Sequence, residues 1–419
     1  RDLVRSRGLG DVYKRQSMNI KEIVKDIFYV GVNDRVKHRF EALWQLPYGV
    51  SYNSYIVAGN EKLALIDTVC IEEVRQYFNN IDSIASDRTI DYLVVNHMEP
   101  DHSASIPEIV MAYPDIRIVG NSKTIDMIKG FYHIDGPDRY LEVKDGDSID
   151  LGGRTLRFHL TPMVHWPETM MTYVEDAGVL FSGDAFGTFG ALNGAVIDRD
   201  METDVHISEM YRYYSCIVGK YGRFVEKAIQ KLAALPLSYI CPTHGPVWNE
   251  KITEVVELVA RLAAYKSEPG VVIVYGSMYG NTAEVAEMIA REIAALGIKR
   301  IIMHNASHSD MSCMITDAFR YSTLIVGSAT YSMRLFPEVE SFMNAMETRE
   351  IKNKVFATFS NFTWAAGAVT GKLKEYAERM KLPVSASLLV KQSAGASTPV
   401  EVKEFALQVA EAMKAMEEA

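Results

Sequence analysis

The sequence predicts an α/β protein built from two domains, and three observations support this prediction. The chain has 419 residues, a length that favours two or three domains over one. Residues 18–264 contain short strands and interspersed helices separated by polar turns, whereas residues 265–419 alternate apolar strands with helices. Alternation of that regularity is typical of a doubly wound parallel sheet. The polar stretch 265–270 is the best candidate for the linker between the two domains.

Composition and charge narrow the class of protein. A hydrophobic content of 48% with 23% charged residues is that of a well-cored soluble protein. The net charge of −10 argues against nucleic acid and against an anionic membrane surface as partners. No apolar run reaches the roughly 18 residues that a membrane span needs. The four cysteines form no Cys-x-x-Cys pair, which disfavours a zinc finger or a rubredoxin-type iron site and favours a reducing, cytoplasmic setting.

The first 17 residues differ from the rest of the chain. They contain five arginines or lysines and lack the apolar core of a signal peptide. Met18 begins a stretch that resembles a natural start. Residues 1–17 are therefore expected to be a non-native or disordered extension.

The elements of the first domain are predicted from local patterns. Short runs of β-branched and aromatic residues predict strands, and helical spacing of apolar residues predicts helices. Pairs such as Gly146-Asp147 separate the strands at the spacing of hairpins. Residues 23–30 and 49–57 contain short strand-like runs interrupted by polar turns. The predicted strands include 62–68, 92–95, 117–120, 179–182 and 238–241, and the predicted helices include 71–81, 105–113 and 122–130.

Potential metal ligands are concentrated directly after the strand 92–95, in the segment that reads His-Met-Glu-Pro-Asp-His. A loop that leaves a strand end can point alternate side chains into one concavity. His97, Glu99 and Asp101 are therefore expected to converge, with His102 just behind them. A polar solvated loop is the alternative, but this density of nitrogen and oxygen ligands favours a metal site.

Three later residues complete this cluster. His165, Asp184 and His244 each follow or lie beside a predicted strand, so they can reach the same edge of the sheets. Because one divalent ion needs about four protein ligands, the whole set predicts two ions. Asp184 is the natural bridge, since one short carboxylate can hold two metals about 3.5–4 Å apart. Five other histidines have no partnered context and are interpreted as structural or solvated: His133, His159, His206, His304 and His308.

In the second domain, strands are predicted at 271–275, 301–302, 323–326, 355–359 and 383–388, with helices that include 282–296 and 400–416. The loop 275–282 reads Tyr-Gly-Ser-Met-Tyr-Gly-Asn-Thr, and such a turn can point N–H groups and hydroxyls at a phosphate. It lacks the lysine of a triphosphate-binding loop and the Gly-x-Gly-x-x-Gly of a dinucleotide site, so it favours a phosphate monoester. A simple helix cap is the alternative.

Two further segments, 328–331 and 360–367, follow neighbouring strands and should share an edge with this loop. Ligands bind at that edge in open α/β sheets. The candidate cofactor-binding residues are Ser277, Met278, Tyr279, Gly280, Asn281, Thr282, Ser328, Ala329, Thr330, Tyr331, Ser360, Asn361, Phe362, Thr363, Trp364 and Gly367.

The ligand pattern, His-x-Glu-x-Asp-His followed by separated His, Asp and His, resembles the metallo-β-lactamase superfamily, which implies an αββα sandwich. Hydrolytic members carry a histidine where this chain has Glu99, and a carboxylate at that position favours iron over zinc. The loop 277–282 resembles the FMN phosphate loop of flavodoxins. A lactamase-like domain with this carboxylate, followed by a flavodoxin-like domain, resembles the flavodiiron proteins across residues 18–419.

The resemblance implies a role for each candidate residue. One iron would be held by His97, Glu99 and His165 and the other by Asp101 and His244, with Asp184 bridging them. His102 and Trp166 are expected just outside the ligand set. Tyr331 and Trp364 would flank the flavin ring, and Trp166, Pro167 and Glu168 would either line the substrate pocket or simply pack.

The resemblance also implies an activity. Electrons would pass through FMN to two irons and reduce dioxygen to water and/or nitric oxide to nitrous oxide. The donor is expected to be external, either a rubredoxin-like protein or a reduced deazaflavin. A head-to-tail homodimer, or a dimer of such dimers, would bring the FMN of one subunit to the irons of the other.

Two other functions are compatible with parts of the pattern. The first is a dinuclear zinc hydrolase with an accessory flavodoxin domain, and Glu99 argues against it. The second is an electron carrier whose first domain is only a scaffold, and the complete set of ligands argues against that.

Overall fold

The computed structural model describes residues 21–86 and 88–418, so the expectation about residues 1–17 lies outside the described part. The chain forms two compact units. The first unit runs through Tyr213 and resumes from Arg223 to Ala260. The second contains Tyr214–Gly222 and the chain from Arg261 onward.

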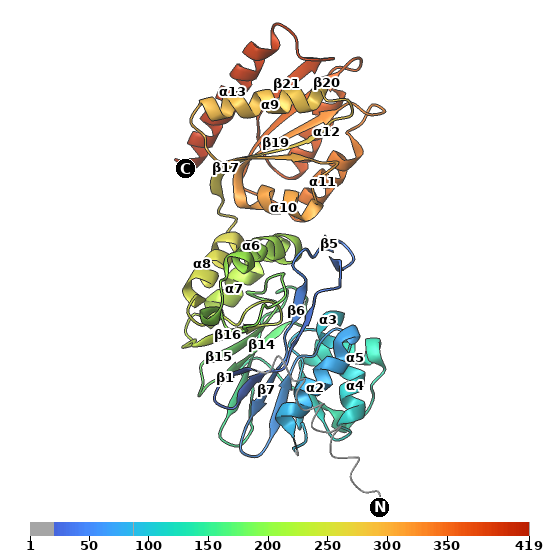
Figure 1. The fold of residues 1–419 in the computed structure, drawn as a ribbon, viewed down its shortest axis with the longest axis vertical. Coiled ribbons are helices and arrows are strands. Elements are labelled where there is room, and N and C mark those ends of the chain that lie inside the picture. The colour runs from blue at the N-terminus through green and yellow to red at the C-terminus, as the bar shows by residue number, and fades with distance from the viewer. Residues whose placement is uncertain (1–20, 87, 419) are drawn as a thin grey trace, which may run out of the picture. The chain divides into compact units, whose positions relative to one another are not determined.

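A seven-stranded sheet forms one layer of the first unit (Figure 1). In order across the sheet, the strands are β1 (Lys21–Val24), β2 (Ile27–Tyr29), β7 (Tyr55–Ala58), β8 (Leu63–Ile66), β9 (Tyr92–Val94), β10 (Arg117–Gly120) and β11 (Tyr140–Glu142). Pairing is antiparallel from β1 to β8 and parallel from β8 to β11. Short ribbons lie outside this sheet: β3 (Val32–Asp34) with β6 (Val50–Tyr52), and β4 (Arg39–Phe40) with β5 (Trp44–Gln45).

A second sheet of five strands forms the other layer. Its strands, in order, are β12 (Ser148–Asp150), β13 (Thr155–Leu160), β14 (Met170–Val174), β15 (Val179–Gly183) and β16 (Tyr239–Pro242). Apolar side chains of the two sheets form one core, in which Val57 and Ile66 of the first sheet join Phe158 and Phe181 of the second, all at most 1% exposed. Burial of each such side chain contributes about 1.5–3 kcal/mol, so the core fixes both sheets firmly.

Helices lie beside each sheet of this unit, as predicted for an αββα sandwich (Figure 1). The helices α2 (Val74–Ala85), α4 (Ile106–Ala112) and α5 (Ser122–Tyr132) accompany the seven-stranded sheet. The helices α6 (Asp204–Tyr213), α7 (Gly222–Leu232) and α8 (Ile252–Ala263) accompany the five-stranded sheet. One expectation needs correction: residues 100–102 are not loop, because Pro100 starts a short helix α3 (Pro100–Ser103), where its fixed φ suits the first helical position.

The second unit is built on a five-stranded sheet in which every pair is parallel. Its strand order is β18 (Ile301–Asn305), β17 (Glu268–Gly276), β19 (Tyr321–Ala329), β20 (Val355–Phe362) and β21 (Val384–Lys391). The helices α9 (Asn281–Ala295) and α13 (Thr398–Glu417) share an apolar core with one face. The helices α10 (Met311–Arg320), α11 (Pro337–Thr348) and α12 (Ala368–Arg379) lie on the other face (Figure 1), which confirms the doubly wound sheet.

The strands of this unit are longer than predicted. β17 begins at Glu268, inside the predicted linker. β19 and β20 continue to Ala329 and Phe362 because their parallel pairing persists to the register Ala329↔Asn361. Ser328 and Ser360 therefore lie within strand ends rather than in loops.

A short segment from the middle of the sequence packs within the second unit. It comprises a π-helical turn (Tyr214–Val218) and a 3-10 turn (Gly219–Tyr221). The Tyr265 hydroxyl donates to the Gly219 carbonyl at 3.0 Å, and a Cβ at Gly219 would lie 3.0 Å from the ring of Phe319. In the described part of the chain, no helix combines the length and the apolar character needed to cross a bilayer.

Candidate metal centre and phosphate-loop pocket

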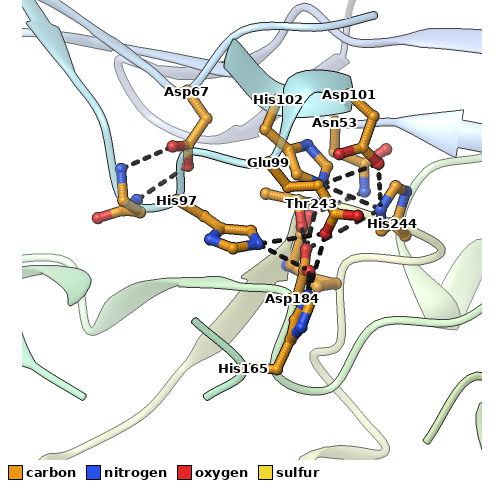
Figure 2. Close-up of polar contacts among 12 residues, drawn as sticks. Asn53, Asp67, His97, Glu99, Asp101, His102, His165, Asp184, Thr243 and His244 are labelled. Carbon is orange, nitrogen blue, oxygen red and sulfur yellow. Dashed lines mark hydrogen bonds and ion pairs between the residues drawn. The ribbon is translucent and has the colours of Figure 1, made fainter. Parts of the chain in front are cut away.

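The candidate metal ligands meet at one edge of the first unit (Figure 2). They come from the segment after β9, from α3, from the loop between β13 and β14, and from the ends of β15 and β16. Asp67 fixes the segment after β9, since its carboxylate accepts hydrogen bonds from the backbone and side chain of Asn96 at 2.7 and 3.0 Å. The fold thus brings together all seven residues: His97, Glu99, Asp101, His102, His165, Asp184 and His244.

The first group comprises His97, Glu99, His165 and Asp184. The His165 Nε2 atom lies 3.0 Å from a carboxylate oxygen of Glu99 and 3.0 Å from the Oδ2 atom of Asp184. The His97 Nε2 atom lies 3.3 Å and 3.4 Å from the same two oxygens. Four ligand atoms therefore converge on one point, and all four side chains are buried.

The second group comprises Asp101, His102 and His244. The Oδ2 atom of Asp101 lies 3.3 Å from His102 Nε2 and 3.2 Å from His244 Nε2. Asp184 reaches this group with its other oxygen, Oδ1, at 3.1 Å from His102 Nε2. One carboxylate thus presents one oxygen to each group, which is the geometry of a bridge between two cations.

The donor set fits metal ions better than hydrogen bonding alone. The Nε2 atoms of His102 and His244 face each other at 3.0 Å, and two imidazole nitrogens can share at most one proton. Both carboxylate oxygens of Asp101 are buried, and neither has a partner in hydrogen-bonding geometry among the described residues. Buried polar groups of this kind need a partner, and a cation in each group would supply it.

Electrostatics couple the two kinds of ligand. Burial alone would lower the pKa of His102, but the charges of Asp101 and Asp184 outweigh burial and raise it to about 9. Burial likewise opposes protonation of His165, yet its hydrogen bonds to Asp184 and Glu99 raise its pKa to about 9. Burial would raise the pKa of Asp184, but His97 and His102 hold it well below its usual range. A metal ion entering the cluster must therefore displace protons from histidine.

Neighbouring groups that the sequence did not reveal orient two of the ligands. The Nδ1 atom of His244 donates to the Ser51 carbonyl at 2.7 Å, which leaves Nε2 free for a metal. The Thr243 hydroxyl donates to Asp184 Oδ1 at 2.5 Å. Each partner is remote in sequence from the ligand that it orients. The spacing of the ligands therefore could not predict either partner.

The residues expected just outside the ligand set differ in position. His102 belongs to the second group together with His244. Its position therefore suits a metal ligand as well as a residue beside the ligands. Trp166 packs its ring edgewise on His97, with ring centroids 5.3 Å apart. A cavity of about 360 Å³ opens onto the cluster and is lined by Glu99 and Asp101, one from each group. Trp166 is not among the residues that line it.

The second unit has a cavity of about 470 Å³ at the carboxyl ends of its strands. It is lined by Ser277, Met278, Tyr279, Asn281, Thr282, Ala329, Thr330, Asn361, Phe362, Thr363, Trp364, Gln392 and Ser393. The other candidates do not line it: Gly280, Ser328, Tyr331, Ser360 and Gly367. Gln392 and Ser393 were missed, although the rule that ligands bind at strand ends would have found them after β21.

The loop 277–282 is stabilised by hydrogen bonds to the side chain of its first residue, Ser277. The Ser277 hydroxyl accepts hydrogen bonds from the backbone N–H groups of Gly280 at 3.2 Å and Ala283 at 3.3 Å. Gly280 has a φ of +98°, which favours glycine, and helix α9 starts at the next residue. The start of α9 therefore faces the cavity with N–H groups, and no lysine or arginine is among the described residues that line it.

The comparisons with known proteins agree with the folds of both units. A family model described as an ODP family beta lactamase matches residues 50–245, and a flavodoxin model matches residues 273–395. The anaerobic nitric oxide reductase flavorubredoxin of Escherichia coli O1:K1 is 33% identical over 353 residues, which cover 83% of this chain and 73% of that protein. The solved structure of rubredoxin oxygen:oxidoreductase from Desulfovibrio gigas is 28% identical with a TM-score of 0.91, and the match covers 96% of this chain and 100% of that one. The flavodiiron protein of Giardia intestinalis, 22% identical with a TM-score of 0.89, shares the fold.

Fold and site together define a two-domain oxidoreductase that combines a lactamase-like metal domain with a flavodoxin domain. The chain belongs to the flavodiiron proteins, whose cofactors are FMN and a pair of iron ions.

Proposed function

We propose that this flavodiiron protein reduces dioxygen to water and/or nitric oxide to nitrous oxide, with electrons that enter through FMN. The observation that carries the proposal is Asp184, whose two oxygens divide between two groups of buried ligands in a chain that also has a flavodoxin cavity. Domains of 18–264 and 265–419 would hold the two cofactors.

The first group of ligands would hold one iron and the second group the other. His97, Glu99 and His165 would bind the first ion, Asp101 and His244 the second, and Asp184 would bind both. His102 is placed to join the second ion. Glu99 supports iron, because a carboxylate in place of an imidazole makes the site harder and more anionic.

When bound, two irons and FMN would together supply the electrons for reduction of a diatomic gas. The chain's own residues do the positioning. Asp184 sets the separation of the two metal positions, and the Ser51 carbonyl directs the His244 Nε2 atom inward. The cavity lined by Glu99 and Asp101 gives a small molecule access to both groups.

The cavity of the second unit would hold FMN. The phosphate would lie against Ser277, Asn281 and Thr282 at the start of α9. Trp364, 69% exposed at the rim, would cover the flavin ring. Tyr331 is 47% exposed and lies outside the lining, so it would act only from the rim.

The names of the relatives support both gases as substrates, since one is named a nitric oxide reductase and another an oxygen oxidoreductase. Their names also support a rubredoxin-like donor, with a reduced deazaflavin as the other candidate. We place the protein in the cytoplasm. A head-to-tail homodimer, or a dimer of dimers, would bring the flavin of one subunit to the irons of another, and exposed Tyr279 and Trp364 offer an apolar rim for such a contact.

The decisive experiment combines cofactor analysis with gas consumption. Purified protein should contain two irons and one FMN per chain, and should consume nitric oxide or dioxygen when supplied with a reduced rubredoxin or deazaflavin. The His165→Ala variant should lose iron and activity. The matched variant His159→Ala should retain both, because His159 lies on β13 and is not among the grouped ligands. Two zinc ions with esterase activity would refute the proposal and support the hydrolase.

A further inference from the structure

Glu168 is a buried carboxylate that contacts a candidate iron ligand. Its side chain is 0% exposed, and its Oε1 atom lies 2.8 Å from the Nδ1 atom of His97. The same oxygen accepts a hydrogen bond from the Met98 backbone N–H at 2.9 Å. Its Oε2 atom is buried and has no hydrogen-bond partner in the described part of the chain. Glu168 does not line the cavity that opens onto the cluster, where one of its two expected roles would have placed it.

A buried carboxylate is costly unless a positive charge or several donors compensate it. His97 is the only ion-pair partner of Glu168 among the described residues. The other ring nitrogen of His97 faces Glu99 and Asp184 (Figure 2). Through the imidazole, the charge of Glu168 is thus directed at the position of the first metal ion.

Among the described residues, no carboxylate pairs with the Nδ1 atom of His102 or of His244 at the second metal position. The Nδ1 atom of His244 donates to the neutral carbonyl of Ser51 at 2.7 Å. A histidine whose Nδ1–H is bonded to a carboxylate is a more basic ligand than one bonded to a carbonyl. The two metal positions are therefore chemically unequal, although both are built from histidine and carboxylate.

We propose that Glu168 is a positioning residue for the iron at His97. By accepting the Nδ1 proton it directs Nε2 to the metal, and its charge makes this iron the more electron-rich of the pair, so that the ferric state is favoured there. This inference rests on the proposed function, because it presumes iron in the first group of ligands. It goes further in assigning unequal roles to the two irons.

The backbone holds Glu168 in place independently of its carboxylate. The side-chain amide of Asn121 donates to the Glu168 carbonyl at 2.5 Å, while Asn121 Oδ1 accepts from the N–H groups of Lys123 and Thr124 at the start of α5. The variant Glu168→Gln keeps this anchor and keeps an oxygen for Nδ1 and Met98. It removes the charge and puts an amide nitrogen in the place of the buried Oε2 atom.

The test compares wild type, Glu168→Gln and Thr172→Val. The glutamine variant should bind ferrous iron about 10- to 100-fold more weakly at one position, measured by competition with a chelator. The midpoint potential of the iron pair should rise in a redox titration followed by electron paramagnetic resonance, while the FMN potentials stay unchanged. Thr172→Val should match wild type in iron affinity and potential, since the Thr172 hydroxyl donates to Asn96 Oδ1, at 2.7 Å in the same buried region, and Thr172 is not among the grouped ligands of the described chain.

Each outcome separates this inference from the proposed function. Wild type without iron would overturn the proposed function. If wild type holds two irons and Glu168→Gln has the same iron affinity and midpoint potential, only the role of Glu168 is overturned. The same conclusion follows if Thr172→Val loses as much iron affinity as Glu168→Gln. A measurement on the unaltered chain avoids any folding defect: in the zinc-loaded protein, the His97 Nδ1 proton should give a downfield, exchange-protected proton resonance. Rapid exchange of that proton would refute the hydrogen bond.

Discussion

Replacement of Asp184 by asparagine tests the two-metal arrangement most directly. Asp184 is 1% exposed and reaches His165 at 3.0 Å with one oxygen and His102 at 3.1 Å with the other. The change conserves size but leaves an amide nitrogen facing one of the two groups, so at least one metal position loses its shared ligand. Loss of groups that merely orient ligands weakens metal binding by about 10- to 100-fold, so loss of a ligand should weaken it by at least about 100-fold. That factor corresponds to about 2.8 kcal/mol per site.

The loss of metal affinity should be measurable in two assays. Iron per chain, measured by elemental analysis after dialysis, should fall from two to one or fewer. Because a ligand that binds only the folded state stabilises it according to its affinity, saturating ferrous iron should raise the unfolding free energy of the variant by about 2.8 kcal/mol less than that of wild type. An Asp184→Asn variant that keeps two irons and the full stabilisation would refute the bridging role.

The matched control is Asp198→Asn in the same unit. Asp198 is also buried, at 3% exposed, and its carboxylate accepts hydrogen bonds from the backbone N–H groups of Arg199, Asn249 and Lys251 at 2.8 to 3.0 Å. It lies outside both groups of ligands. Its replacement should lower stability without changing iron content, which separates general damage to the domain from loss of a metal ligand.

Three other predictions concern separate features. Glu99→His should shift the metal content from iron toward zinc and lower gas reduction, measured on protein from media supplied with both metals; unchanged iron would contradict the role of Glu99 in metal choice. Burial lowers the pKa of Lys354 to about 7 in the folded chain. The unfolded chain keeps an ordinary lysine pKa and so binds the proton more tightly. The unfolding free energy should therefore rise by about 2 kcal/mol between pH 7 and 9. Denaturant titrations at both pH values should show this rise reduced in Lys354→Met, and an equal rise in the variant would refute it. Trp364→Ala should weaken FMN binding by about 2- to 10-fold, through loss of roughly 0.5–1.5 kcal/mol of ring stacking, in fluorescence titrations of the flavin-free protein; equal affinity would place the flavin ring elsewhere.

Some parts of the structure could be predicted because they depend on local pattern. Parallel strands buried on both faces read as continuous apolar runs, and this made the strands beginning near Val271 and Val355 recognisable. The candidate ligands could be grouped because residues that follow strands of packed sheets reach a common edge. Position after a strand therefore carried the information about the site.

The features that escaped prediction depend on contacts between distant segments. Glu168 meets His97 across 71 positions of sequence, and Ser51 meets His244 across 193. No periodicity encodes such a pair, because each partner is set by the packing of the two sheets. The helical turn at Pro100 was missed for the opposite reason, since four residues are too few to show a helical period.

The turns at Tyr214–Gly222 have a consequence for how the protein can be divided. They belong to the second compact unit although they lie well before residue 261 in sequence. A fragment cut at residue 264 would carry Tyr214 and Gly219 away from the ring of Phe319, which both lie against. The two halves are thus interleaved along the chain, and neither can be exchanged between relatives as an uninterrupted cassette. A chimaera that respects the fold needs three junctions: before Tyr214, after Gly222 and near Arg261.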